Sequence, residues 1–135
     1  MFIGAGLLLL VALSAALFVR LAPVSIADVR SLETKPPGDY RMAGGHHAVR
    51  PLETVDLAAL EARIAETVRT RALYGSAGNL PMVFVHRSAF WGFPDVTQVW
   101  VGEGNVHVYS HLVYGTSDLG VNRKRMKGWF ASLGL

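Results

Sequence analysis

The sequence of 135 residues contains no cysteine, which excludes disulfide bonds and a thiolate nucleophile. It also has little net charge: 13 basic and 10 acidic residues give a formal charge of +3, too small to predict nucleic-acid binding. A Gly-x-Ser-x-Gly elbow and a phosphate-binding P-loop are both missing from the sequence. We therefore predict one domain that is not an enzyme, with no catalytic residues, no cofactor and no metal.

Charge is missing altogether from the first part of the chain. The run Phe2–Val19 contains no charged residue and a single hydroxyl, that of Ser14. Eighteen helical residues span about 27 Å, slightly less than a hydrocarbon core of about 30 Å. Arg20 can extend its charged end to the surface, so that Leu21 and Ala22 complete the span. We predict a retained single-pass transmembrane anchor over residues 1–22.

A cleaved signal peptide is the alternative interpretation of this run. Ala12-Leu13-Ser14 has small residues at the spacing that cleavage requires, but the positively charged region that precedes a signal core is missing. Arg20, Arg30 and Lys35 follow the span and no cation precedes it. By the positive-inside rule, this asymmetry weakly favours a cytoplasmic domain.

Residues 23–50 lack a periodic apolar pattern and are rich in proline and glycine. We predict a tether here, with one short structured piece at most. Within it, His46 and His47 raise the question of a metal site. Adjacent side chains diverge in most backbones, and no acidic residue or cysteine is near enough to complete the site. The pattern predicts a pair of histidines in a flexible loop.

Residues 51–135 show the alternation of helical and strand patterns expected of a small α+β domain. An apolar stripe that begins at Leu57 and ends at Val68 predicts an amphipathic helix, with Asp56 as its N-cap. Residues 81–88, 96–101 and 106–111 are typical of strands, a fourth strand around 72–74 is possible, and residues 123–133 predict a final helix. The expected architecture is a small antiparallel sheet flanked by two helices, with His107, Tyr109 and His111 on one face of the third strand.

The stretch from Tyr114 to Phe130 predicts a turn followed by the start of the last helix. Asn122 is expected to cap the helix, and Asp118 to hydrogen-bond to amides within the turn. Three cations are expected on the solvent face of the helix: Lys124, Arg125 and Lys127. They either meet an anionic partner or form an ordinary solvated face.

Two segments, "HRSAFWGFPD" (residues 86–95) and "YSHLVYGTSDLGVNRKRMKGWF" (residues 109–130), resemble the domain of unknown function 1499 (DUF1499) family. The similarity covers roughly Pro51 to the C-terminus. It implies a small bacterial or plastid protein, often with an N-terminal membrane anchor and often exported. This resemblance places the expected domain on the periplasmic side of a bacterial inner membrane. It implies no activity.

The chain departs from the family pattern at several arginine positions. Ala89 stands where members often have arginine, and residues 110–113 read Ser-His-Leu-Val where members often read Ser-Arg-Ser-Arg. If the family has an anion pocket made of arginines, this chain is expected to lack part of it. We expect Arg87 and Asp118 to form a structural pair between strand and turn.

Two functions are consistent with these observations. The first is a non-catalytic accessory subunit that docks on a larger membrane protein complex, such as a respiratory or photosynthetic one. Its partners are membrane lipid and subunits of that complex. Its candidate interface residues are Trp91, Phe93, Lys124, Arg125 and Lys127, although the aromatic rings would equally fit a loop that folds back onto the sheet.

The second function is a free membrane-tethered module that binds a small anionic ligand or a lipid headgroup. Its candidate contacts are Arg87, His111 and Arg123. Asp118 and Asn122 have structural roles in both hypotheses.

Overall fold

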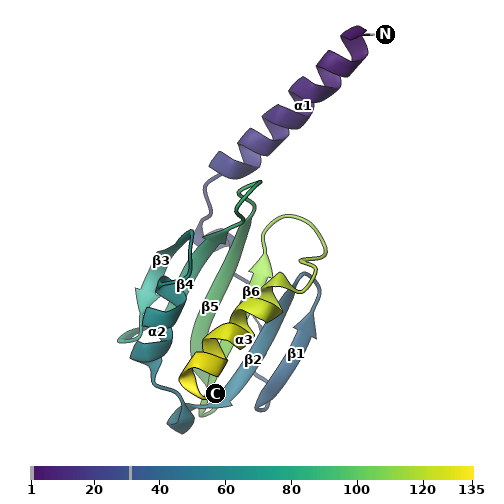
Figure 1. Cartoon of the computed structure of the whole chain (residues 1–135). Coiled ribbons are helices and arrows are strands. Elements are labelled where there is room, and N and C mark those ends of the chain that lie inside the picture. Colours follow the sequence, from purple (N-terminus) through teal and green to yellow (C-terminus); the bar gives the residue numbers. More distant parts are fainter. Residues whose placement is uncertain (1, 31) are drawn as a thin grey trace.

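The computed structural model describes residues 2–30 and 32–135, and it places an apolar helix on a small α+β domain (Figure 1). Helix α1 (Phe2–Leu21) projects from one end of a six-stranded antiparallel sheet with the order β1-β2-β6-β5-β4-β3. The strands are β1 (Gly38–Met42), β2 (Gly45–Pro51), β3 (Thr70–Ser76), β4 (Asn79–Arg87), β5 (Pro94–Gly102) and β6 (Asn105–Leu112). Two α-helices, α2 (Leu57–Ala65) and α3 (Val121–Leu133), and two short 3-10 helices, η1 (Ile26–Asp28) and η2 (Leu52–Thr54), complete the fold.

The predicted α+β class is confirmed, and the sheet is larger than the sequence indicated. The three expected strands are β4, β5 and β6, and the possible fourth is β3. The prediction of a tether over residues 23–50 was wrong for its second half, because β1 and β2 form one side of the sheet there. Gly44, with a φ of +65°, lies in the turn that joins these two strands. Glycine is common both at left-handed positions in tight turns and in flexible linkers. The glycines of this segment therefore indicated a linker although they form a turn.

Helices α2 and α3 cover one face of the sheet, and the main core lies beneath them (Figure 1). Asp56 caps α2 as predicted, because its carboxylate accepts hydrogen bonds from the amides of Ala58 and Ala59. The helix is shorter than expected: it ends at Ala65, and Val68 lies beyond it, 68% exposed. The core residues come from both helices and from strands β2, β4, β5 and β6: Ala48, Leu60, Ile64, Met82, Phe84, Val99, Val106, Val108, Met126, Trp129 and Phe130.

The other face of the sheet is crossed by Ala22, the last residue of the predicted anchor, and by the first half of the predicted tether. We call this segment the strap (residues 22–30 and 32–37). Val24 packs in a second cluster with Val83, Val85 and Val96. The backbone amide of Arg30 donates to Gln98 Oε1 at 3.1 Å, and the Gln98 side chain donates to the Arg30 carbonyl. The strap is therefore part of the folded domain.

All five histidines of the chain are buried, each at most 2% exposed. His46 and His47 lie in β2, so the prediction of a flexible-loop pair was wrong. His47 Nε2 lies 3.1 Å from His107 Nδ1 on the neighbouring strand β6. Burial, and after it the adjacent His107, lowers the pKa of His47 to about 4. Burial, and after it Arg125, lowers the pKa of His86 to about 3.

These buried histidines predict that acid destabilises the fold. An unfolded histidine has a pKa near 6.5, so below that pH the unfolded state binds more protons than the native state. The contribution is fully present above pH 6.5 and is lost as the pH falls toward the folded values. The free energy of unfolding, measured by urea denaturation, should therefore decrease from about pH 7 to about pH 4.5.

The control for this prediction is His86→Gln, which cannot gain a proton at that position. This variant should be less stable at pH 7, because one of two buried hydrogen bonds is lost, but it should lose less stability on acidification than the unmodified chain. An identical loss in both proteins would contradict the role assigned to His86.

Candidate anion-binding cavity at the base of helix α1

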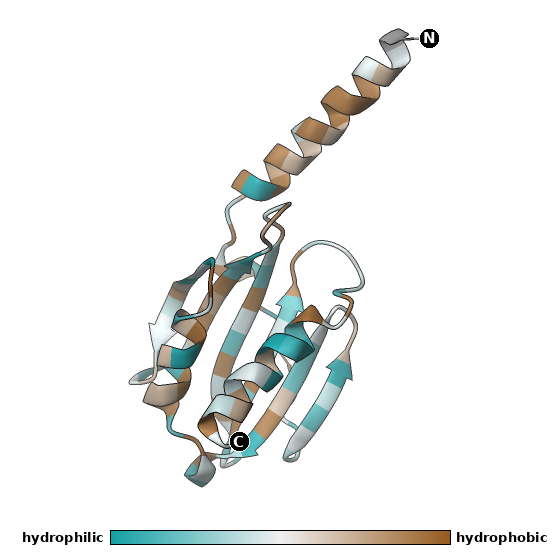
Figure 2. Cartoon of the chain, viewed as in Figure 1, coloured by the Kyte–Doolittle hydropathy of each residue, from teal (hydrophilic) through white to brown (hydrophobic). Residues whose placement is uncertain are grey.

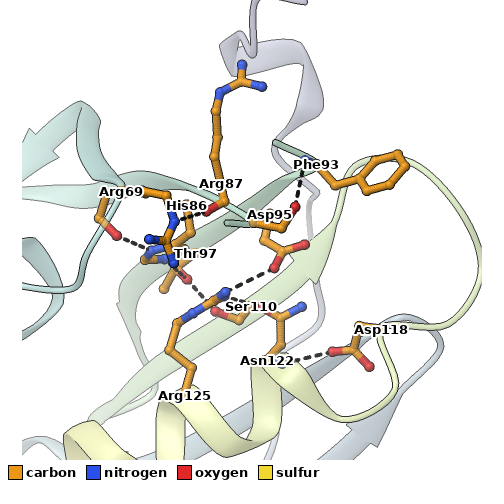
Figure 3. Close-up of polar contacts among 12 residues, drawn as sticks. Arg69, His86, Arg87, Phe93, Asp95, Thr97, Ser110, Asp118, Asn122 and Arg125 are labelled. Atoms are coloured by element: carbon orange, nitrogen blue, oxygen red, sulfur yellow. Dashed lines mark hydrogen bonds and ion pairs between the residues drawn. The ribbon is translucent and has the colours of Figure 1, made fainter. Parts of the chain in front are cut away.

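The last turn of α1 is held by a side chain from β4. The final carbonyls of a helix lack intrahelical donors and carry partial negative charge. Arg87 supplies those donors: its guanidinium donates to Val19 O at 3.1 Å and to Ala22 O at 2.7 Å. A further hydrogen bond, of 3.0 Å, runs to Gly92 O in the β4–β5 loop (residues 88–93). Figure 3 shows the long side chain of Arg87 extending away from the sheet.

The end of α1 also contacts the β4–β5 loop directly. Arg20 Nη1 donates to Phe90 O at 3.0 Å. Gly92 has a φ of +70°, and a Cβ added to it would lie 2.8 Å from Arg20 Cγ, so the close approach requires glycine. The end of α1 and the β4–β5 loop are thus linked twice: by Arg87, which donates to both, and by Arg20, which extends from α1 to the loop.

A cavity of about 370 Å3 lies where the base of α1 meets β3 and β4. Four arginines contribute to its wall: Arg20, Arg69, Arg71 and Arg87. Among the described residues, no carboxylate lies within 4 Å of any of these four guanidinium groups. The other lining residues are Leu21, Thr70, Val85, Ser88 and Gly92.

The four arginines do not all have the same freedom to bind a ligand. Arg87 is committed to backbone carbonyls, and Arg20 uses one nitrogen in that way. Arg69 donates only its Nε, to Arg87 O at 3.1 Å, and Arg71 is exposed without a hydrogen-bond partner in the described chain. The terminal nitrogens of Arg69 and Arg71 are therefore available, and guanidinium groups bind phosphate or carboxylate with paired hydrogen bonds.

The predicted anion site of Arg87, His111 and Arg123 is not formed. Arg87 lines the cavity at the base of α1, whereas Arg123 lines a different cavity together with Arg41. His111 is buried against the ring of Tyr109, and burial lowers its pKa. Sequence reasoning missed Arg69 and Arg71. Arg69 precedes β3 and has a φ of +55°, so strand alternation could not have placed its side chain beside that of Arg71.

The residues that carry the family resemblance are used to attach α3 to the sheet (Figure 3). The prediction of Asn122 as the cap was wrong, because Asn122 lies inside the first turn of α3 and Gly120 is the N-cap residue. Asp118, two residues before Gly120, supplies the acceptor: its carboxylate accepts from the amides of Gly120 and Asn122, both at 3.0 Å. Burial alone would raise the pKa of Asp118, but these hydrogen bonds outweigh it and hold the pKa below its ordinary value. The expected pair of Arg87 and Asp118 is absent from the described chain, since the two side chains have the separate partners given above.

Arg125 does not lie on the solvent face, contrary to expectation. Its guanidinium donates to Asn122 Oδ1 at 2.7 Å and to Asp95 Oδ2 at 3.2 Å, and Asp95 is itself nearly buried. Burial raises the pKa of Asp95 even though Arg125 opposes that shift. Arg125 therefore belongs to an ion pair beneath the helix and does not lie on its exposed face.

A line of polar side chains continues this network under α3 (Figure 3). The His86 ring lies between Thr70 Oγ1 at 2.6 Å and Thr97 Oγ1 at 2.7 Å, and the Thr97 hydroxyl is bonded to that of Ser110. Thr97 and Ser110 are fully buried, and His86 is 1% exposed. A substrate cannot reach these groups, so we interpret them as a satisfied structural network.

The remaining candidate interface residues are exposed. Trp91 is 52% and Phe93 43% exposed, so the aromatic rings do not fold back into the core. Lys124 and Lys127 lie on the exposed side of α3.

These features define a class: a small α+β domain joined through one arginine to an apolar helix. A family model described as "Protein of unknown function (DUF1499)" matches residues 22–133, and the chain belongs to this family. The match begins well before Pro51, so the family domain includes the strap and the first two strands. Comparison with curated proteins and with solved structures gives no match.

The role of Arg87 predicts a local effect on the end of α1. In Arg87→Ala the last carbonyls of the helix lose their charged donor, so the Ala22 amide, which bonds to Phe18 O, should exchange more readily. The lost charged hydrogen bonds contribute more than about 1 kcal/mol, so the Ala22 amide should exchange at least roughly five times faster than in the unmodified chain. Hydrogen–deuterium exchange of the full chain in detergent measures this rate.

Two variants serve as controls for that measurement. Arg87→Lys should give an intermediate rate, because one ammonium group cannot span the same three carbonyls as the planar guanidinium. Arg71→Ala changes the same cavity without touching α1 and should leave the Ala22 rate unchanged. Equal rates in Arg87→Ala and the unmodified chain would show that Arg87 does not cap the helix.

Proposed function

We propose that the chain is a non-catalytic, membrane-anchored module that binds a phosphate-bearing anion in the arginine cavity. The observation that carries this proposal is the set of four arginines that line one cavity, without a carboxylate within 4 Å of their guanidinium groups in the described chain. Like charges that line one cavity repel one another, and a bound anion relieves that repulsion. Arg69 and Arg71 supply the free donors.

The anchor in this proposal is α1. Residues Gly4–Leu21 have a mean hydropathy of 2.2 and none of this stretch is buried against the domain, so the helix is long and apolar enough to cross a membrane. Figure 2 shows α1 as hydrophobic along its length, with a hydrophilic residue at its base. Arg20 at that base is part of the cavity wall, so in this proposal the cavity lies at the depth of the lipid headgroups.

The compartment belongs to the same proposal. We propose a single-pass protein of a bacterial inner membrane with its domain on the periplasmic side, as the family resemblance implies. The cations that follow α1 favour the cytoplasmic side by the positive-inside rule. Protease protection in intact and permeabilised spheroplasts distinguishes the two orientations.

The cavity predicts anion binding that depends on Arg71. Full-length protein in nanodiscs should retain phosphatidylglycerol over phosphatidylcholine by native mass spectrometry, or bind inorganic phosphate by calorimetry. Arg71→Gln should weaken that binding by about tenfold or more, because one charge-assisted hydrogen bond contributes about 1.5 kcal/mol or more. The first method tests a lipid headgroup and the second a free anion.

Lys127→Gln is the matched control, because it removes the same charge from an exposed position on α3. Its binding should change less than about twofold, as expected for a distant surface charge. If Lys127→Gln weakens binding as much as Arg71→Gln, the attraction is a general charge effect and the cavity is not the site. Failure of both lipid and phosphate to bind would overturn the proposal.

The accessory-subunit function is a second candidate, favoured by the exposed cations of α3. Arg123, Lys124 and Lys127 are exposed, and no carboxylate of the described chain lies within 4 Å of them. Such a row suits an acidic partner subunit of a larger membrane complex.

Co-purification tests this second function. From native membranes solubilised in mild detergent, the chain should elute with a larger assembly whose subunits mass spectrometry identifies. Replacing all three cations by glutamine should release the chain from that assembly at moderate salt, because complementary charge is lost. Elution of the unmodified chain alone, near its own mass, would rule out the subunit function.

A further inference from the structure

Two loops at one end of the domain expose an unusual number of large apolar side chains. One is the β4–β5 loop (residues 88–93), and the other is the β6–α3 loop (residues 113–120) together with the first residue of α3. We call these exposed side chains the apolar rim: Phe90, Trp91, Phe93, Tyr114, Leu119 and Val121.

Leu119 is the most distinctive member of the rim. Its side chain is 93% exposed and its backbone has a φ of +52°, a conformation that a residue with a Cβ adopts at a cost. The surrounding turn fixes this conformation: Ser117 Oγ accepts from the Leu119 amide at 3.4 Å, and Asp118 binds the next amide. The turn therefore holds a large apolar side chain in solvent, where it gains nothing from the rest of the described chain.

The two loops are joined by an apolar groove. A cavity of about 410 Å3 lies between them, with Phe93, Leu112, Tyr114, Leu119 and Val121 in its wall. Phe93, Tyr114, Leu119 and Val121 thus line one continuous surface, and Phe90 and Trp91 lie on the same loop as Phe93. Continuous apolar patches mark contacts with a membrane or a partner.

The rim lies at the end of the domain from which α1 leaves (Figures 1 and 2). The hydrogen bond from Arg20 to Phe90 O fixes the β4–β5 loop against the last turn of α1. Trp and Tyr gather at the membrane–water interface because their rings are apolar and their polar groups remain hydrated. The surface that α1 would enter is therefore within reach of Trp91 and Tyr114.

We propose that the apolar rim inserts into the interface of the bilayer that α1 crosses, so that the domain rests on the membrane in one orientation. Exposed cations lie beside the rim: Arg41 and Arg123 line a neighbouring cavity together with Leu119. Cations beside exposed apolar side chains suit a membrane surface with anionic lipids. The proposal depends on α1 as the membrane anchor, but it does not depend on anion binding in the cavity.

Depth-dependent quenching of tryptophan fluorescence tests this proposal on the full chain. The protein is reconstituted into phosphatidylcholine vesicles whose acyl chains carry bromine near the headgroup. In a Trp91→Phe background, which keeps Trp100 and Trp129 in every protein compared, one further tryptophan is placed either at Leu119 or at Leu52, and its quenching is taken relative to that background. Leu52 is an exposed leucine of η2, whose amide bonds to Gly104 O in the turn at the opposite end of the sheet.

The Leu119→Trp protein should be quenched at least about twice as strongly as the Leu52→Trp protein, because only the rim reaches the brominated interface. The native Trp91 provides a second measurement: quenching should be stronger in the unmodified chain than in Trp91→Phe alone. Equal quenching of the two introduced tryptophans, with no contribution from Trp91, would overturn the proposal. If lipid leaves the rim unquenched but native membranes shield it from acrylamide, its occupant is a protein.

The outcome is separable from that of the arginine cavity. Arg71→Gln should leave quenching in neutral phosphatidylcholine vesicles unchanged, because insertion of the rim there requires no anion. Loss of anion binding with intact quenching would contradict only the arginine-cavity proposal. Loss of quenching with intact anion binding would contradict only the rim proposal. An Arg71→Gln chain whose rim is no longer quenched would contradict the independence of the two surfaces.

Discussion

The arrangement of this molecule depends on one guanidinium group, that of Arg87. It donates to Val19 O in the last turn of α1, to Ala22 O at the start of the strap and to Gly92 O in the β4–β5 loop, so three separate segments meet at one side chain. A planar cation suits this position because the end of a helix carries partial negative charge and unpaired acceptors. The orientation of the domain relative to α1 follows from this contact, as does the place of the cavity and the rim beside the helix.

The motif that identifies the family is used for structure. Asp118 holds the first turn of α3, and Asn122 and Arg125 connect that helix to Asp95 on β5. Their donors and acceptors are largely satisfied by one another, which leaves them little capacity for a ligand. In the arginine cavity, the donors that remain free are the terminal nitrogens of Arg69 and Arg71, and both residues lie outside the motif. A family signature can thus mark how a fold is held together without marking where it binds.

The sequence predicted the elements whose patterns are local and regular. Strand β6 alternates as expected, with Val106 and Val108 under the helices and His107 and Tyr109 on the other face. It did not predict β1 and β2, because glycines that form a hairpin turn cannot be distinguished by composition from glycines in a linker. Nor did it predict the cavity, whose arginines come from three segments that only the folded sheet brings together.

The two ends of the sheet differ in a way that supports a function at the α1 end. At the far end, β3–β4 and β5–β6 are joined by the two-residue turns Ala77–Gly78 and Glu103–Gly104, which carry no large apolar side chain. At the α1 end, the connections 88–93 and 113–120 are longer and expose the aromatic and aliphatic side chains of the rim. Stability alone favours short polar turns at both ends. Ordering a long loop costs conformational entropy, and its exposed apolar side chains contribute no burial that would offset this cost. The asymmetry is explained if the long loops meet a surface, and α1 determines which end of the domain that surface can reach.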